Sequence, residues 1–216
     1  MDLHGNLPGR LCGIAAAPGS RATRGRRQSA KVRPMIRAAA FVLVTGFFAA
    51  VSRKSLLKPR SHGFPRFFAW EAILGLVLLN AAPWFKAPFS PLQLASWVLL
   101  FASIFLAIHG AWLLRAVGKP DGNRPGEELL AFEKTSSLVA VGAYRYIRHP
   151  LYLFLLALAW GVFLKRPSPA GAFLAAAASF FLLLTARCDE SECLKQFGDA
   201  YRSYMLRTKR FIPFVF

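Results

Sequence analysis

Long apolar runs, separated by polar segments, occupy most of the chain from residue 38 onward. Runs of this kind predict membrane-spanning helices, because about 20 apolar residues in a helix match the hydrocarbon layer of a bilayer. The turn at 165–169 is short and holds two prolines, so it should join the last two runs into an antiparallel hairpin. The runs that we expect to form helices are residues 38–51, 67–85, 93–114, 151–164 and 170–186.

Two of these runs depart from a simple membrane helix. As a helix, 38–51 would be about 21 Å long, shorter than the roughly 30 Å hydrocarbon layer, so neighbouring residues complete the span or the helix is tilted or re-entrant. The run 67–85 contains Glu71. A carboxyl group is costly in lipid, so we expect it to face other helices or the interface. We also expect a structural role for His109, near the end of 93–114.

Composition supports a membrane protein. Hydrophobic residues make up 55% of the 216 positions and charged residues only 18%, below the roughly 25% usual in soluble domains. The chain has 28 Lys and Arg against 10 Asp and Glu. The basic residues lie between apolar runs, a placement that suits anionic lipid headgroups and not nucleic acid. The 3 cysteines have no metal-ligand spacing, so we expect neither a disulfide framework nor a metal site.

These patterns predict an all-α integral membrane protein with about five transmembrane helices, including the C-terminal hairpin, and an amphipathic C-terminal helix over residues 189–206. We divide the chain into a basic, disordered tail at 1–34, N-terminal membrane helices at 35–114 and a C-terminal region at 115–216 that carries the candidate chemistry. An alternative is that translation begins at Met35, where the character of the sequence changes abruptly.

Basic residues between the runs predict which loops face the cytoplasm. Segments 52–66, 115–148 and 187–210 are rich in Lys and Arg and are expected on the cytoplasmic side. With five passes the basic tail would then lie outside, which the same rule disfavours. Either the tail is absent from the protein or the first helix does not cross the membrane.

Two clusters of polar and aromatic residues bracket the hairpin. One is the segment 142–152, with the sequence GAYRYIRHPLY, and the other runs from Asp189-Glu190 to Pro213. A hairpin returns the chain to the side on which it began, so the two clusters should meet at one membrane face. We therefore expect the first cluster and the carboxylates of the second to wall a single cavity.

The order of these features resembles a known enzyme family. The pattern Gly-x-Tyr-x-x-x-Arg-His-Pro-x-Tyr is followed by a helical hairpin, an acidic pair, Phe-Gly-x-x-Tyr-x-x-Tyr and a late Phe-Ile-Pro. This arrangement, over roughly residues 135–216, resembles the isoprenylcysteine carboxyl methyltransferase family, and phospholipid N-methyltransferases share the same C-terminal architecture. The resemblance implies an enzyme that transfers a methyl group from S-adenosylmethionine to a membrane-resident substrate, with the cofactor held between the ends of the last helices.

The resemblance also implies particular site residues. Aromatic rings such as Tyr144 and Tyr152 suit an adenine ring or a sulfonium cation, and carboxylates can accept hydrogen bonds from the cofactor's ammonium or ribose hydroxyls. The implied catalytic residues are Arg148, His149 and Glu190. If the acceptor is an amine, His149 or Glu190 would take its proton, whereas a carboxylate acceptor needs no base. The implied cofactor contacts are Ser136, Val139, Tyr144, His149, Pro150, Tyr152, Asp189 and Glu190.

Two departures from the family's pattern bear on the substrate. The acidic pair is Asp-Glu where Glu-Glu is common, so its first carboxylate reaches less far. Relatives that act on prenylated cysteine have a substrate-binding arginine where Thr185 stands. The nearby Arg187 would point elsewhere, because two residues turn a helix by about 200°.

Three functions are therefore compatible with the sequence. The resemblance favours carboxyl methylation, as by a protein-S-isoprenylcysteine O-methyltransferase. The alternatives are N-methylation of a phospholipid such as phosphatidylethanolamine and a non-catalytic membrane scaffold. The expected partners are a lipid-like or prenylated substrate and membrane lipids, with no nucleic acid and no metal. The expected location is a bacterial inner membrane, crossed several times, with the active site at the cytoplasmic face.

Overall fold

The computed structural model describes residues 20–82, 84–85, 87–119 and 135–213, with side chains from residue 34 onward. The chain divides into two compact units, Met1–Ala40 and Phe41–Phe216. Helix α1 (Ser20–Leu56) includes residues of both units. The tail that we predicted at 1–34 is therefore helical from Ser20, and its first 19 residues lie outside the described part of the chain. Alanine, arginine, lysine and glutamine favour helix, and this propensity outweighs the missing apolar periodicity.

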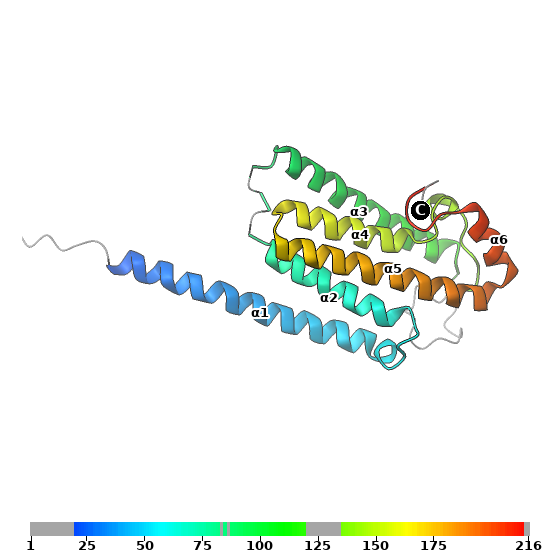
Figure 1. Ribbon diagram of the computed structural model, residues 1–216, viewed down its shortest axis with the longest axis horizontal. Helices are drawn as coiled ribbons and strands as arrows, with labels where there is room; N and C mark the ends of the chain where they lie inside the picture. The colour runs from blue at the N-terminus through cyan, green and yellow to red at the C-terminus, as the bar shows by residue number, and fades with distance from the viewer. Residues whose placement is uncertain (1–19, 83, 86, 120–134, 214–216) are drawn as a thin grey trace, which may run out of the picture. The chain divides into compact units, whose positions relative to one another are not determined.

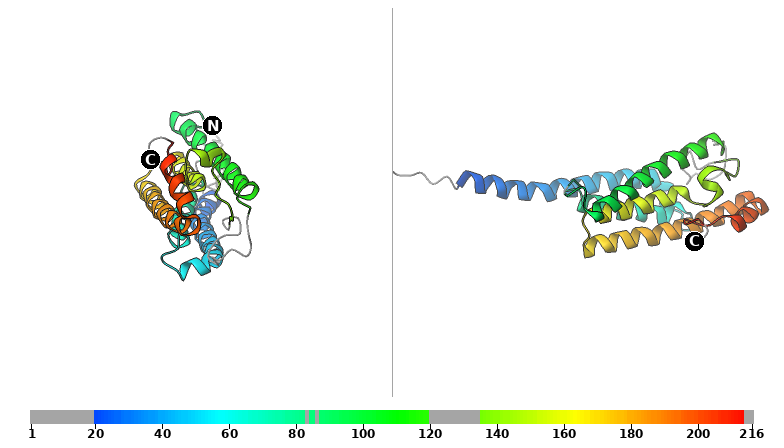
Figure 2. Two further views of the ribbon diagram at one scale, coloured as in Figure 1. Left: turned by 90° about the vertical axis from the view of Figure 1, so that its right-hand side faces the viewer. Right: turned by 90° about the horizontal axis from the view of Figure 1, so that it is seen from above.

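Helices α2 to α5 of the second unit run side by side (Figure 1). Helix α4 packs between α3 and α5, and α2 packs against α5 and α4 (Figure 2). No strand occurs among the described residues, and the prediction of an all-α membrane protein is confirmed. The elements of this unit after α1 are α2 (Gly63–Leu79), α3 (Pro91–Ala116), the 3₁₀ turn η1 (Gly142–Arg145), α4 (Pro150–Lys165), α5 (Pro169–Phe197) and α6 (Asp199–Arg207).

Three helical segments of the described chain are long and apolar enough to cross a membrane, namely Pro34–Leu56, α3 and α5. Helix α4 is a shorter apolar helix, and α2 has 17 residues. The short apolar run at 38–51 is extended on both sides, which supplies the length that the run lacks by itself. Glu71 of α2 accepts a hydrogen bond from Thr45 Oγ1 of α1 at 2.6 Å, so it faces another helix, as we predicted.

Helix α5 differs from its prediction at its C-terminal end. We expected an apolar helix to end at Ala186 and a separate charged helix to follow at 189–206, but α5 continues without a break to Phe197. The break comes at Gly198, whose φ of 53° lies in the left-handed region that glycine adopts without strain. The onset of charge at residue 187 marks where the apolar part of the helix ends, and charged residues then continue it because most of them favour helix.

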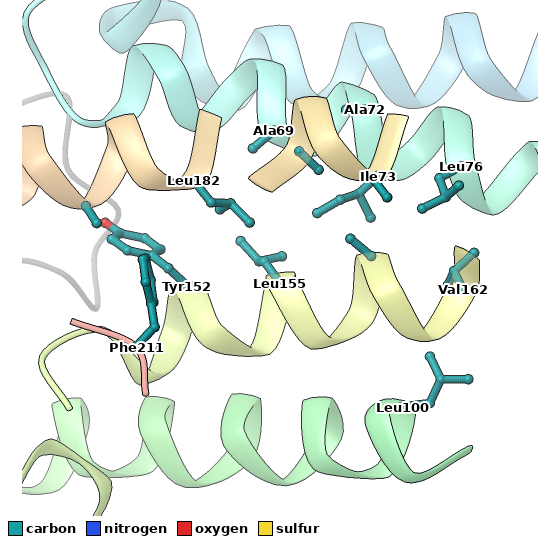
Figure 3. Close-up of a cluster of buried hydrophobic side chains, with 14 residues drawn as sticks. Ala69, Ala72, Ile73, Leu76, Leu100, Tyr152, Leu155, Val162, Leu182 and Phe211 are labelled. Atoms are coloured by element: carbon teal, nitrogen blue, oxygen red, sulfur yellow. The ribbon is translucent and has the colours of Figure 1, made fainter. Parts of the chain in front are cut away.

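Small side chains bring α2, α4 and α5 close together. Ala159 of α4 and Ala175 and Ala178 of α5 are fully buried, which lets the backbones approach. Leu76 and Leu182 fill the space between the three helices, as Figure 3 shows. The core is continuous from α2 to α5 and holds both arms of the hairpin in one position.

Polar side chains of α2 and α3 fix the C-terminal end of α4, which lies far from the polar clusters. The last carbonyl groups of a helix have no partner within the helix and need donors from elsewhere. The donors here are the side-chain amide of Asn80, directly after α2, and an amide and a hydroxyl of α3. The hydrogen bonds are Asn80 Nδ2 to the Val162 carbonyl (2.9 Å), Ser96 Oγ to the Gly161 carbonyl (2.7 Å) and Gln93 Nε2 to the Lys165 carbonyl (2.9 Å).

Candidate active site

Backbone hydrogen bonds join the segment before α4 to the end of the chain. The Arg148 N–H donates to the Lys209 carbonyl (2.7 Å), and the Lys209 N–H donates to the Tyr146 carbonyl (3.1 Å). The His149 N–H donates to the Arg210 carbonyl (3.2 Å). Both polar clusters therefore meet at the same end of the hairpin, as the sequence predicted.

Glu190 holds this junction together. Its side chain is 7% exposed, and Oε1 accepts hydrogen bonds from Arg148 Nε (2.8 Å) and Arg210 Nε (3.1 Å). Its other oxygen accepts from Arg210 Nη2 at 2.7 Å, and these bonds raise the pKa of Arg210 further. Arg148 also donates to the carbonyls of Met205 (3.2 Å) and Thr208. Glu190 thus ties α5 to both the segment before α4 and the chain end.

His149 lies between the two carboxylates of the acidic pair. Its Nδ1 is 3.4 Å from Asp189 Oδ2 and its Nε2 is 3.3 Å from Glu190 Oε1. Burial alone would lower the pKa of His149, but the hydrogen bonds to Asp189 and Glu190 outweigh it and raise that pKa. Carboxylates accept and do not donate, so the two contacts favour the imidazolium form of the ring, with hydrogen on both nitrogens. A fixed positive charge suits positioning of the carboxylates better than removal of a further proton.

A pocket of about 810 Å³, including its open mouth, lies at this end of the hairpin. The walls combine the carboxylates of Asp189 and Glu192 with aromatic rings, among them Tyr144, Tyr152 and Phe197. The Tyr152 hydroxyl donates to Asp189 Oδ2 at 3.2 Å. The pocket therefore offers carboxylates beside aromatic faces, with the basic side chains of Arg148 and His149 also in its wall.

Six of the predicted site residues line the pocket, and three of the described ones lie outside its walls. Ser136 is exposed and donates to the Lys119 carbonyl at 2.9 Å. Pro150 is buried at the first position of α4. Glu190 faces the arginines, because one residue turns a helix by about 100° relative to Asp189. The six that line the pocket are Val139, Tyr144, Arg148, His149, Tyr152 and Asp189. The roles given to all nine stay predictions.

Several wall residues are absent from the predicted set. Glu192, Cys193 and Phe197 follow Asp189 at helical spacing, so they share one face of α5. That periodicity was a usable signal in the sequence. His62 lies in the connection between α1 and α2, and no pattern in the sequence links it to the hairpin.

His62 and Glu192 form a hydrogen-bonded pair in the pocket wall. Glu192 Oε1 accepts from the His62 backbone N–H (2.8 Å) and Oε2 accepts from His62 Nδ1 (2.7 Å). Arg66 Nη1 lies 3.4 Å from His62 Nε2. A guanidinium group only donates, so Nε2 is on the accepting side of this contact.

Asp189 is close to this pair. Polar atoms of His62, Asp189 and Glu192 lie within 4.8 Å of one another, a spacing that a metal ion could also span. Because both ring nitrogens of His62 already have hydrogen-bonding partners, we interpret the group as a hydrogen-bonded network. Our expectation of a metal-free site stays a prediction.

Comparisons with known proteins bear on this region of the chain. A family model described as phospholipid methyltransferase matches residues 92–200, just over half of the 216 residues. The chain is also similar to "Methanethiol S-methyltransferase 1" of Bradyrhizobium diazoefficiens, with 25% identity over 148 residues. The aligned part is 68% of this chain and 49% of the relative, so the chain spans about half the length of the curated relative it matches. No solved structure matches the chain.

Proposed function

Because this chain belongs to the phospholipid methyltransferase family, and is therefore a membrane methyltransferase, we propose that it transfers the methyl group of S-adenosylmethionine to a lipophilic thiol. The family match confirms our prediction that the protein is a membrane methyltransferase. The donor and the acceptor are our proposal. The observation that carries it is the pocket in which carboxylates and aromatic rings stand together at the polar end of the hairpin.

The pocket suits a cationic donor. When bound, S-adenosylmethionine supplies an activated methyl group on a positively charged sulfur. The ring faces of Tyr144, Tyr152 and Phe197 could hold its adenine or its sulfonium group. Asp189 could accept hydrogen bonds from its ammonium or ribose hydroxyls. Alignment of donor and acceptor, and exclusion of water by the apolar walls, would supply most of the rate acceleration.

The acceptor is better supported as a thiol than as a carboxylate. The position that holds an arginine in relatives acting on prenylated cysteine is Thr185, which is buried and donates to the Phe181 carbonyl at 2.7 Å. Arg187 is exposed outside the pocket walls. Carboxyl methylation of a prenylated cysteine would therefore lack the arginine with which those relatives bind their substrate.

The relative and the family description point to two other methyl acceptors, a thiol and a phospholipid amine. The relative's name states that it methylates a thiol, which supports our choice. The family's description names phospholipids, which supports a phospholipid amine as the second candidate. In both cases the pocket would open at the cytoplasmic face of a bacterial inner membrane. The basic segments 52–66 and 187–210 both supply residues of the pocket wall, and basic segments favour the cytoplasmic side.

Cofactor binding tests the donor. Detergent-purified protein is titrated with S-adenosylmethionine by calorimetry, and micromolar binding is expected. Asp189→Asn should weaken binding about tenfold or more, because it removes a charged hydrogen-bond acceptor. Asp199→Asn is the matched control, since its side chain is 96% exposed on α6. The absence of binding heat for the unsubstituted protein would favour the non-catalytic scaffold.

Product chemistry tests the acceptor. The protein is incubated with membranes, methyl-labelled S-adenosylmethionine and a lipophilic thiol. A thioether or methylamine product resists mild base, whereas a methyl ester is hydrolysed by it. Base-labile label would return the assignment to carboxyl methylation.

A further inference from the structure

The pocket contains a carboxylate whose surroundings differ from those of the acidic pair. Glu192 is 27% exposed, so it reaches the pocket, while its partner His62 is 1% exposed. Among the described residues, Glu192 accepts hydrogen bonds from His62 alone. Because both of its oxygens are held by one residue, the carboxylate has a fixed orientation while retaining lone pairs for a further donor.

The other carboxylates at this end have more donors. Glu190 accepts from Arg148 and Arg210 and lies outside the pocket walls. Asp189 accepts from Tyr152, and the His149 imidazolium lies 3.4 Å from it. Positive charge and multiple donors hold both groups in their ionised form, which makes them poor proton acceptors.

His62 has a different kind of partner on its far side. Arg66 Nη1 is 3.4 Å from His62 Nε2, and Arg66 is buried and lies 5.0 Å above the ring of Trp70. Arg66 therefore contacts the far nitrogen of the ring, and Nδ1 faces Glu192. Glu192 therefore has an imidazole as its side-chain partner, in contrast to the two guanidinium groups that contact Glu190.

We propose that Glu192, oriented by His62, accepts the proton that a thiol loses when it is methylated. This proposal rests on the proposed function and names its proton acceptor. The thiol sulfur forms a bond to the methyl carbon, and the bond between that carbon and the sulfonium breaks. Its electron pair stays on the departing sulfur, which becomes a neutral thioether, and the S–H proton moves to the Glu192 carboxylate. The products are a methyl thioether, S-adenosylhomocysteine and a protonated Glu192.

The proposal assigns part of the site to the N-terminal half of the chain. His62 lies outside residues 92–200, the segment that the family model matches. It does not touch the reacting atoms in this scheme and acts through Glu192, so it is a positioning residue. The first membrane helices therefore contribute to chemistry as well as to anchoring.

Two isomeric thiols separate proton removal from other roles of Glu192. Benzyl mercaptan is mostly protonated at about pH 8, whereas 4-methylbenzenethiol is mostly ionised and needs no base. Glu192→Gln should lower kcat for benzyl mercaptan by ~100-fold or more, the usual effect of general acid–base catalysis, and lower it only a few-fold for the aryl thiol. Affinity for S-adenosylmethionine, measured by calorimetry, should change little, and this binding also shows that the variant is folded.

Further variants test the pairing itself. Glu192→Asp should restore part of the activity toward benzyl mercaptan. His62→Gln should lower kcat for that thiol with a smaller change in KM, and should spare the aryl thiol. Asp199→Asn, on an exposed carboxylate, should leave both rates unchanged.

Each unfavourable result has a separate meaning. Equal losses for both thiols in Glu192→Gln, or no loss for either, would overturn the proton-acceptor role while leaving the proposed function intact. Cofactor binding without methylation of either thiol by the unsubstituted protein would overturn the thiol as acceptor and this role with it. No cofactor binding at all would overturn the proposed function.

Discussion

Replacing Glu190 with glutamine should destabilise the protein while leaving every side chain of the pocket wall in place. The carboxylate is 7% exposed and accepts hydrogen bonds from Arg148 and Arg210. Glutamine keeps the shape of the side chain but removes its charge. The two guanidinium groups then lose a counter-charge in surroundings where water replaces it poorly.

The magnitude follows from burial. Removing one partner of a buried ion pair costs about 3–5 kcal/mol. The lower end applies to Glu190, because Arg210 is 20% exposed and solvent screens part of its charge. For a chain of this size 1 kcal/mol corresponds to about 2–4 °C, so a loss of about 3 kcal/mol lowers Tm by roughly 6–12 °C.

Thermal unfolding of the detergent-purified variant measures this loss. Asp199→Asn serves as the control, because it removes a carboxylate that is 96% exposed. Below its own Tm, Glu190→Gln should still bind S-adenosylmethionine, because Glu190 lies outside the pocket walls. A Tm no lower than that of the control would refute the role of Glu190 as the residue that joins α5 to the chain end.

Three further changes test other parts of the structure. Stability should decline as pH rises above 6.5, the ordinary pKa of His149. Because folding raises the pKa of His149, its protonated ring contributes fully to stability below the unfolded-state pKa. This contribution is lost as pH rises through the folded-state pKa. His149→Gln should flatten this part of the Tm–pH profile, and an unchanged slope would count against the imidazolium. Gly161→Leu should cost about 1–3 kcal/mol in the thermal assay, because a Cβ there would lie 3.0 Å from Leu100. Gly46→Leu, with nothing within 4 Å, should change Tm little. Dialysis against a chelator should leave methyl transfer unchanged, because both ring nitrogens of His62 already contact protein side chains. Activity that is lost on dialysis and restored by one divalent cation would indicate a metal centre instead.

Hydropathy predicted the bounds of some membrane helices closely and those of others poorly. Helix α4 (Pro150–Lys165) extends the predicted run 151–164 by one residue at each end. The prediction failed for α5, which continues to Phe197. The length of an apolar run indicates how much of a helix can lie in the hydrocarbon layer. The helix itself ends where its backbone is interrupted, here at Gly198.

The site was predictable only where its residues belong to one continuous motif. The segment around His149 and the acidic pair are local in sequence, and hairpin geometry brings them together. His62 is 130 residues from Glu192 in sequence, so only tertiary packing reveals their contact. Arg210 carried no signal of its own either, because a basic residue near a membrane face is usually a headgroup contact.

The acidic pair serves two separate purposes, because neighbouring residues of a helix point about 100° apart. Glu190 faces two arginines, while Asp189 faces the pocket together with Glu192. Replacing the pair as a block would abolish activity through unfolding and would not test the chemistry. Single variants separate the two roles. Asp189→Asn should lower affinity for S-adenosylmethionine with only a small change in Tm, since its side chain is 25% exposed, whereas Glu190→Gln should do the reverse. Equal effects of the two variants on both measurements would show that the pair acts as one unit after all.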